Sequence, residues 1–202
     1  MPVRRRIAAA FGSAAFALVL GCAQNIVQDK SIGSGDSLAA KKVAVIPFRA
    51  EPRTGAEPLR GDAAALVGGY VAEGFSARGV DAVPPSDVEQ ALGGAPSGKS
   101  VVELARDRFG ADAVVVGTVY RFRERGGEAL GTTHPASVGF EVKVYTADGK
   151  LFRSKVFDHT QVALSENALT AAQYPGGGTR WLTAEELARW GASELVKSLP
   201  LQ

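Results

Sequence analysis

Residues Gly110 to Arg123 read GADAVVVGTVYRFR, and they carry the strongest strand signal in the chain. Apolar residues occupy almost every position from 113 to 122, so both faces of an extended segment would be largely apolar. This pattern is typical of a strand that is buried on both sides, and it predicts a central strand in a covered sheet. One face would carry Val114, Val116, Thr118, Tyr120 and Phe122, and the other Ala113, Val115, Gly117 and Val119.

Toward the N-terminus, a second buried strand is predicted at Lys42 to Phe48, which reads KVAVIPF. An amphipathic helix follows over about 66–75, because apolar residues there recur at helical spacing. Gly68, Gly69 and Gly74 lower its helix propensity, which indicates a close approach to the sheet. A short apolar piece over residues 80–83 predicts one more strand.

Two short helices are predicted between that piece and the central strand. Ser86 with Glu89, and Ser100 with Glu103, each stand three residues apart, which is the spacing of a capping box at a helix N-terminus. Glycines after each apolar pattern, at Gly93 and Gly110, would end these helices.

Toward the C-terminus, residues 138–145 alternate between apolar and polar, which predicts a strand with one buried face and one wet face. Asp148 and Gly149 mark a hairpin turn, and the return strand runs over about 151–162. A short helical stretch follows around 166–172. A last helix opens with Thr183 and Glu186 as its capping box. Its inward-facing residues are Leu187, Trp190, Leu195 and Leu199.

The elements follow the order βαβααβββ and then one or two helices. This order predicts an α/β (α+β) fold, with a mixed β-sheet and helices packed on it in two or three layers. We expect a single domain over residues 42–202, because no internal repeat is visible and the length suits one core.

The first 21 residues predict an export signal peptide. Arginines at positions 4–6 precede an apolar run, Ile7–Leu20, that is too short to cross a bilayer as a helix. The run ends in Val19–Cys22, which holds the only cysteine of the chain and resembles the lipobox of bacterial lipoproteins. The resemblance implies removal of the leader and acylation of Cys22, which would hold the protein to membrane lipid. An ordinary secretory signal and an uncleaved anchor are the alternatives.

Residues 22–41 predict a lipidated N-terminus followed by a flexible tether, because they are mostly polar and show no sustained periodicity. Ala23 follows the cysteine, and lipoproteins retained in an inner membrane typically carry Asp there. The resemblance to lipoproteins therefore implies the outer membrane, with the domain on its periplasmic face.

Charge argues against nucleic acid as a partner. The chain has 23 Lys and Arg and 21 Asp and Glu, and three of the basic residues lie in the leader. No basic cluster remains that could form a phosphate-binding face.

Gly93 to Ser100 fits the spacing of a phosphate-binding loop, but its context favours a simple connection. Such a loop requires a buried strand directly before it, whereas residues 86–92 are patterned as a helix. Ser100 also has a structural role as a helix cap. Nucleotide binding is therefore the least favoured function, and we expect no cofactor.

Catalytic and metal sites have no support in the sequence. His134 and His159 are the only histidines and fall on different elements, whereas a zinc site needs three or four ligands. Asp158 and Glu166 are explained as well by surface positions as by a carboxylate pair. We therefore expect a protein that is not an enzyme.

Two aromatic residues are candidates for contact with a partner. Tyr174 and Trp181 flank a glycine-rich segment, and Tyr and Trp are enriched at protein interfaces. The alternative for Trp181 is that it covers the sheet edge. Trp190, in contrast, is expected in the core.

Four segments together resemble small bacterial envelope lipoproteins related in fold to CsgG, LpoB and the N-terminal domain of TolB. They are residues 42–48, 110–123, 157–167 (FDHTQVALSEN) and 180–188 (RWLTAEELA). The resemblance spans about Lys42 to Leu199. It bears on the fold more than on the role, because function differs among members of this superfamily.

Two departures from those proteins limit what carries over. A CsgG-like pore needs amphipathic membrane hairpins, but residues 123–128 read RERGGE. An LpoB-like activator needs a long tether, and here the tether is short. We therefore expect a non-enzymatic outer-membrane lipoprotein that docks onto an unidentified envelope protein. A subunit of a homo-oligomeric envelope export or secretion assembly is the alternative.

Overall fold

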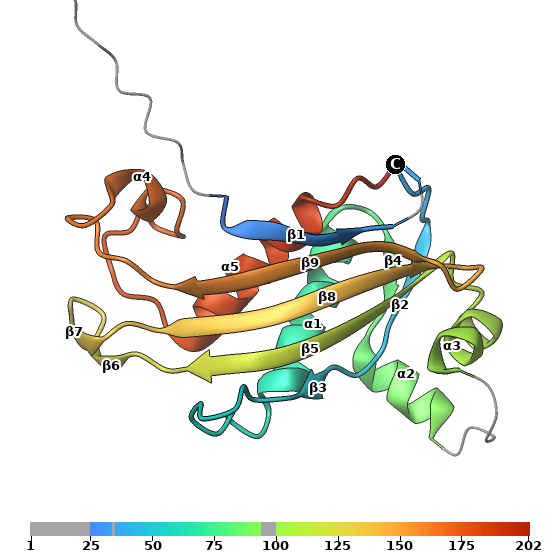
Figure 1. The fold of residues 1–202 in the computed structure, drawn as a ribbon, viewed down its shortest axis with the longest axis horizontal. Coiled ribbons are helices and arrows are strands. Elements are labelled where there is room, and N and C mark those ends of the chain that lie inside the picture. Colours follow the sequence, from blue (N-terminus) through green and yellow to red (C-terminus); the bar gives the residue numbers. More distant parts are fainter. Residues whose placement is uncertain (1–24, 34, 94–99) are drawn as a thin grey trace, which may run out of the picture.

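The computed structural model describes residues 25–33, 35–93 and 100–202 (Figure 1). The strands are β1 (Val27–Ile32), β2 (Lys42–Val45), β3 (Arg49–Ala50), β4 (Asp81–Val83), β5 (Ala113–Arg123), β6 (Gly126–Glu128), β7 (Gly131–His134), β8 (Ser137–Thr146) and β9 (Leu151–Thr160). The helices are α1 (Ala63–Ala77), α2 (Pro85–Leu92), α3 (Val101–Phe109), α4 (Ala168–Ala171) and α5 (Ala184–Lys197).

The described strands form one mixed sheet of seven strands and a separate two-stranded sheet. The large sheet has the order β1-β9-β8-β5-β2-β4, and β3 also pairs with β5. The small sheet, β6 with β7, lies in the polar connection after β5, where no strand was predicted. The mixed sheet and its packed helices confirm the predicted α/β (α+β) class.

β5 is the central strand, as the sequence predicts. It runs parallel to β2, with Val43 opposite Ala113, and antiparallel to β8 along its full length. β8 continues into β9 through a tight turn at Gly149, whose φ of 80° suits glycine. The sheet therefore extends from β5 in both directions, through β2 to β4 on one side and through β8 and β9 to β1 on the other.

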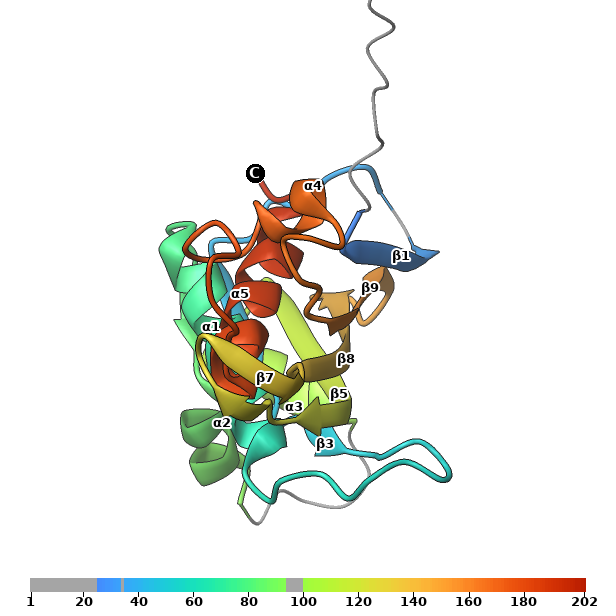
Figure 2. The ribbon, with the colours of Figure 1, turned by 90° about the vertical axis from the view of Figure 1, so that its left-hand side faces the viewer.

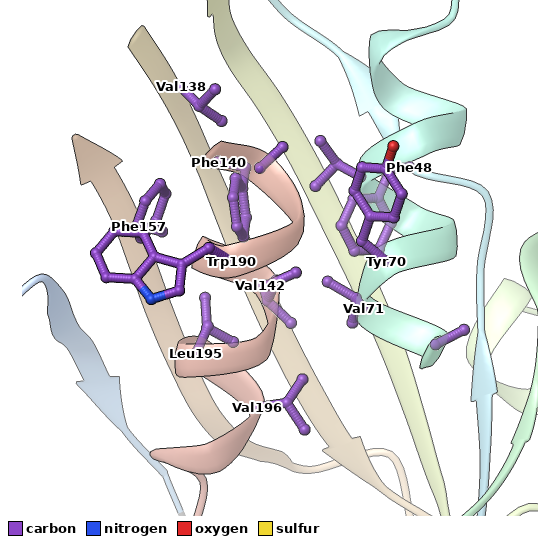
Figure 3. Close-up of a cluster of buried hydrophobic side chains, with 14 of the residues drawn as sticks. Phe48, Tyr70, Val71, Val138, Phe140, Val142, Phe157, Trp190, Leu195 and Val196 are labelled. Atoms are coloured by element: carbon purple, nitrogen blue, oxygen red, sulfur yellow. The ribbon is translucent and has the colours of Figure 1, made fainter. Parts of the chain in front are cut away.

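Helices cover the two faces of the sheet unequally. α1 and α5 lie on one face and enclose the larger core, as Figures 1 and 2 show. In Figure 3, side chains of α5 lie over Phe140 and Val142 of β8, and Tyr70 of α1 lies beside Phe48. α2 and α3 cover the other face only where β2 and the start of β5 lie. This smaller core contains Ala44, Ile46, Val88, Ala105, Ala111 and Val114. The rest of that face is called the open face below.

A bulge at Tyr120 changes which residues of β5 face the core. Val119 lies opposite Phe140 and Phe122 lies opposite Val138, so one extra residue stands between these two pairs. Phe122 therefore joins the core under α1 and α5, whereas strict alternation placed it with Tyr120. A bulge shifts the phase of a strand in this way, and the residue pattern gave no sign of it.

The glycines of α1 serve helix packing more than sheet packing. A Cβ at Gly74 would lie 3.1 Å from Val196 of α5, and one at Gly68 would lie 3.1 Å from Pro85 of α2 and 3.5 Å from Phe48. A Cβ at Gly69 would meet nothing within 4 Å. The expected approach to the sheet is thus replaced by approaches to α2 and α5.

Two of the three predicted capping boxes are present. Ser100 with Glu103 opens α3, and Thr183 with Glu186 opens α5. The box predicted at Ser86 is wrong, because α2 begins at Pro85 and has no side-chain cap. Proline suits this first helical position because its missing N–H would have no partner there.

The prediction of a flexible tether over residues 22–41 is wrong from Val27 onward. β1 pairs antiparallel with β9, and Val27 is only 4% exposed. Lys155 forms an ion pair with Asp29 at 2.8 Å, and Arg153 donates to the carbonyl of Gly35 at 2.7 Å. The other residues of β1 are exposed, so this edge strand lacks the apolar alternation by which a strand is recognised.

Gly117→Ala tests the close packing above β5. The added Cβ would lie 2.2 Å from the ring of Phe48, which is itself buried. We expect the free energy of unfolding to fall by about 1–3 kcal/mol, the usual cost of overpacking a filled core. Chemical denaturation followed by circular dichroism measures this change.

Gly69→Ala is the matched control, because the new Cβ enters open space. Its better helix propensity is expected to raise the free energy of unfolding by up to about 1 kcal/mol. Equal effects of the two substitutions would contradict the proposed packing.

Candidate functional site

Two of the sites predicted from the sequence fall outside the described residues, in whole or in large part. Cys22 precedes the first described residue, Asn25, so its lipidation stays a prediction. Between Gly93 and Ser100, the six inner residues are not described, but α2 ends just before this segment and α3 begins just after it. The segment thus joins two helices, and it lacks the preceding buried strand that a phosphate-binding loop requires.

Tyr174 is a core residue, which corrects its expected role as a partner contact. Its side chain is 2% exposed, and its ring meets that of Trp190 edge-on with centroids 5.0 Å apart. Its hydroxyl accepts a hydrogen bond from the N–H of Val162 at 3.1 Å and lies 2.5 Å from Nε2 of His159. Tyr174 therefore secures the segment after β9 to the core.

His159 is held neutral by its surroundings. Burial lowers the pKa of its imidazole, Arg121 lowers it further, and Asp158 opposes the change. Burial also raises the pKa of the Tyr174 hydroxyl. Both groups of this hydrogen-bonded pair thus stay uncharged at neutral pH, which suits their position between aromatic rings.

The remaining titratable candidates are not brought together. His134 lies on β7, in the hairpin, whereas His159 lies on β9. Asp158 binds arginines on the open face, and Glu166 accepts from the N–H of Ala163 at 3.4 Å. In the described ranges, no group of three His, Cys, Asp or Glu side chains could hold a metal ion.

Trp181 is partly exposed and is held in place through its backbone. Its N–H donates to the carbonyl of Ala129 at 2.8 Å, and its carbonyl accepts from Arg125. The side chain of Gln161 bridges the two neighbouring positions, donating to the carbonyl of Arg180 at 2.9 Å and accepting from the N–H of Leu182 at 2.7 Å. These bonds join the β6–β7 hairpin to the segment before α5.

Large apolar side chains gather around Trp181. Leu130, at the tip of the β6–β7 hairpin, is 88% exposed, and Leu164 and Leu169 are 45% and 55% exposed. Leu130, Leu164 and Trp181 line one hollow of about 90 Å³, and Leu169 lies on α4, which follows the segment that carries Leu164. Figure 2 shows this end of the molecule facing the viewer. We call these four residues the end surface.

An ion pair joins the segment next to Trp181 to the first turn of α5. Arg180 donates two hydrogen bonds to Glu186, both 2.8 Å long. This pairing lowers the pKa of Glu186 to about 2, and the same carboxylate caps α5 through Thr183. The capping box was visible in the sequence, but nothing there showed that Arg180 would complete it.

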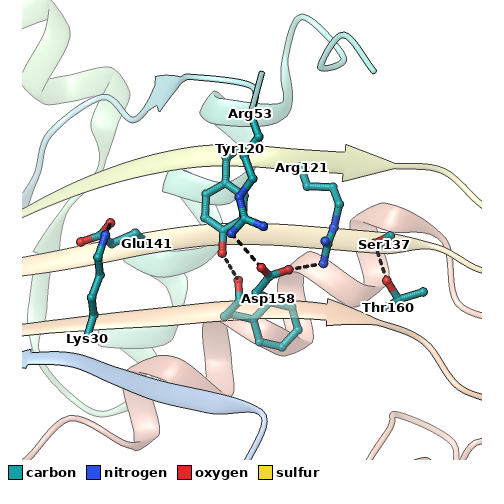
Figure 4. A network of polar contacts seen from close by, with 9 residues as sticks. Lys30, Arg53, Tyr120, Arg121, Ser137, Glu141, Asp158 and Thr160 are labelled. Atoms are coloured by element: carbon teal, nitrogen blue, oxygen red, sulfur yellow. Dashed lines mark hydrogen bonds and ion pairs between the residues drawn. The ribbon is translucent and has the colours of Figure 1, made fainter. Parts of the chain in front are cut away.

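The open face carries a second polar arrangement, drawn in Figure 4. Asp158 of β9 binds both Arg53, at 2.9 Å, and Arg121 of β5. The guanidinium of Arg53 stacks on the ring of Tyr120, 4.0 Å from its centroid. Tyr120 in turn covers Gly139, where a Cβ would lie 2.3 Å from the ring. Sequence reasoning missed this site because Arg53 is distant in sequence from the strands that it joins.

No helix in the described part of the chain combines the length and apolar character needed to cross a bilayer.

His159 predicts a pH dependence of stability. Because folding lowers its pKa below the ordinary value of 6.5, the unfolded chain binds more protons as the pH falls through 6.5, and stability is lost there. We expect His159→Gln to reduce the drop in melting temperature between about pH 7 and 5. His134→Gln, which removes the histidine of the β6–β7 hairpin, is the matched control. An unaltered profile for His159→Gln would disprove the assignment.

Comparison with known proteins shows a fold but no family. No protein-family model matches the chain, and no curated protein matches its sequence. The fold is similar to that of PelC from Paraburkholderia phytofirmans, solved as a dodecamer, with a TM-score of 0.52 and 18% identity over 87% of this chain and 97% of that chain. The lipoprotein GNA1162 from Neisseria meningitidis matches with a TM-score of 0.43 and 17% identity over 59% of this chain and 83% of that one.

The likeness to PelC extends over almost the whole of both chains, so it shows a shared fold. It does not test the specific resemblance to CsgG, LpoB and TolB, which stays a prediction.

Proposed function

We propose that this chain is a lipid-anchored protein of the bacterial outer membrane that faces the periplasm and acts without catalysis, by binding another envelope protein. The lipobox-like sequence at Val19–Cys22 supports the anchor. The end surface, with its exposed leucines and Trp181, supports the binding role, since exposed apolar patches mark interaction sites.

The observation that carries this proposal is the position of β1 relative to Cys22. β1 begins at Val27, only five residues after the cysteine, and five residues span at most about 18 Å. In Figures 1 and 2 the start of β1 and α4 lie at the same end of the molecule. An acylated Cys22 would therefore hold α4, which carries the exposed Leu169, close to the bilayer. Confinement there would raise the local concentration of any partner at the same membrane.

A second candidate function is that of a subunit in a homo-oligomer. It is favoured by the shared fold with PelC, which was solved as a dodecamer. β1 also pairs with β9 alone, so its outer edge is free of sheet partners in the described residues. An edge strand of this kind can serve as a lateral contact between copies.

Cys22→Ala tests the lipid anchor. Metabolic labelling with a fatty-acid analogue is expected to mark the native protein and to leave the variant unlabelled, because Cys22 is the only cysteine. Ala23→Asp is the matched control, since it should keep the label and move the protein from the outer to the inner membrane. Label retained in Cys22→Ala would refute acylation at this residue.

Crosslinking from Leu130 separates the two candidate functions. A photoreactive amino acid placed there in the native envelope is expected to yield an adduct with a different envelope protein, whereas an adduct with the same chain would favour the homo-oligomer. The control position is Arg108 on α3, at the other end of the sheet in Figure 1. Equal yields at both positions would exclude the end surface as a specific contact.

A further inference from the structure

The open face bears two arginines at the end of β5 that are not equally neutralised. Arg121 and Arg123 lie opposite Gly139 and Ser137 of β8, so both project from the same face. The bulge at Tyr120 produces this arrangement by turning Phe122 into the core between them.

Charge on this face is unbalanced. Asp158 is one carboxylate shared by two guanidinium groups, those of Arg53 and Arg121. The guanidinium of Arg123 makes no hydrogen bond and no ion pair among the described residues. The nearest polar side chains in the register, Ser137 and Thr160, are bonded to each other at 2.6 Å. Arg123 therefore carries a positive charge that no ion pair among the described residues neutralises.

Two buried donors add an independent observation. The Nε atoms of Arg121 and Arg123 are both shielded from solvent and have no hydrogen-bond partner. Buried N–H groups are nearly always paired in folded proteins. The two guanidiniums are thus incompletely bonded within the protein, and because the Nε atoms themselves are shielded, a ligand in a neighbouring pocket would meet their outer N–H groups.

A pocket lies directly beside these groups. Its volume is about 210 Å³, and its walls are the loop residues Ala56, Glu57 and Pro58 together with residues 120–123 of β5. This is smaller than the pockets of about 300–1,000 Å³ that hold drug-sized ligands. A molecule the size of a monosaccharide or a short organic acid matches it better.

We propose that this pocket binds a small anionic ligand through its carboxylate or phosphate group, with Arg123 as the principal contact and Arg121 beside it. A planar guanidinium presents paired N–H donors that match either oxyanion. Ala56 and Pro58 give the body of the ligand an apolar wall. Glu57 is exposed at the rim. Its negative charge repels an anion there, so a bound ligand must place its anionic group beyond Glu57, next to the arginines. This inference does not depend on the lipid anchor or on the end surface.

The test is calorimetric titration of the purified native protein, with D-glucuronate and inorganic phosphate as anionic probes and D-glucose as the neutral probe. Saturable binding of either anion, without binding of glucose, is the expected result. Binding of glucuronate alone would show that the ligand is an acidic sugar or an organic acid. Binding of phosphate alone would show that the ligand carries a phosphate group. The proposal is overturned if neither anion binds at millimolar concentration.

Variants then locate the site. Arg123→Gln is expected to weaken anion binding about tenfold or more, as the loss of a charge-assisted contact implies, and Arg123→Lys is expected to be intermediate. Glu57→Gln is expected to strengthen binding, because it removes a like charge from the rim. Arg108→Gln, an exposed arginine on α3, is the matched control and should bind as the native chain does. Unchanged binding in Arg123→Gln would overturn the proposal.

A measurement on the native protein tests the site without relying on variants that could fail to fold. In the native protein, the side-chain Nε–H signals of Arg121 and Arg123 in nitrogen-15 NMR spectra are expected to shift on addition of the anion. The corresponding signal of Arg108 should stay in place. Shifts of equal size at all three arginines would show non-specific ion binding and would contradict the assignment.

Discussion

β5 can be removed from water only if elements cover both of its faces, and the rest of the structure follows from that requirement. Val115 and Val119 lie under α1 and α5, whereas Val114 lies under α2 and α3. Each such buried side chain contributes about 1.5–3 kcal/mol relative to an exposed position. Both edges of the strand are also used, by β2 and β3 on one side and by β8 on the other. The packing of Phe48 above Gly117 completes the fit of this layer.

The bulge at Tyr120 divides β5 into a stretch whose side chains pack in the core and an end that carries Arg121 and Arg123. Up to Val119 the strand is an ordinary core strand. Past the bulge, Phe122 continues the core while Arg121 and Arg123 stand on the open face. Bulges commonly redirect side chains near functional positions in sheets. Here the change of phase brings a basic pair beside the loop that carries Arg53 and Glu57, and it is the origin of the anion pocket that we propose.

The N-terminal strand changes the picture of how the domain would sit at a membrane. A long flexible tether would let the domain turn freely, whereas β1 fixes the chain to β9 from Val27 onward. An anchor at Cys22 would then restrict which end of the domain faces the lipid. The end surface is also rigid, because Gln161, Tyr174 and Arg180 secure its loops to the sheet and to α5. A rigid apolar surface at a fixed place suits a protein that works by contact, since little ordering entropy is lost on binding.

Residue patterns alone were enough to predict the strands that have apolar side chains and the helices that have a periodic apolar face or a capping box. β5, β8, β9, α1 and α5 were predicted because period and capping are local properties of the chain. Most of the candidate surface was not predictable. Trp181 was recognised by its residue type, but Leu130 and Leu164 became its neighbours only through the fold, and Tyr174 proved to be buried. β1 escaped notice because it is a polar edge strand, stabilised by ion pairs with residues more than a hundred positions away. The phase of β5 after Tyr120, and with it the placement of Arg121 and Arg123, was decided by pairing with β8, because a bulge is a property of two strands together and not of one sequence.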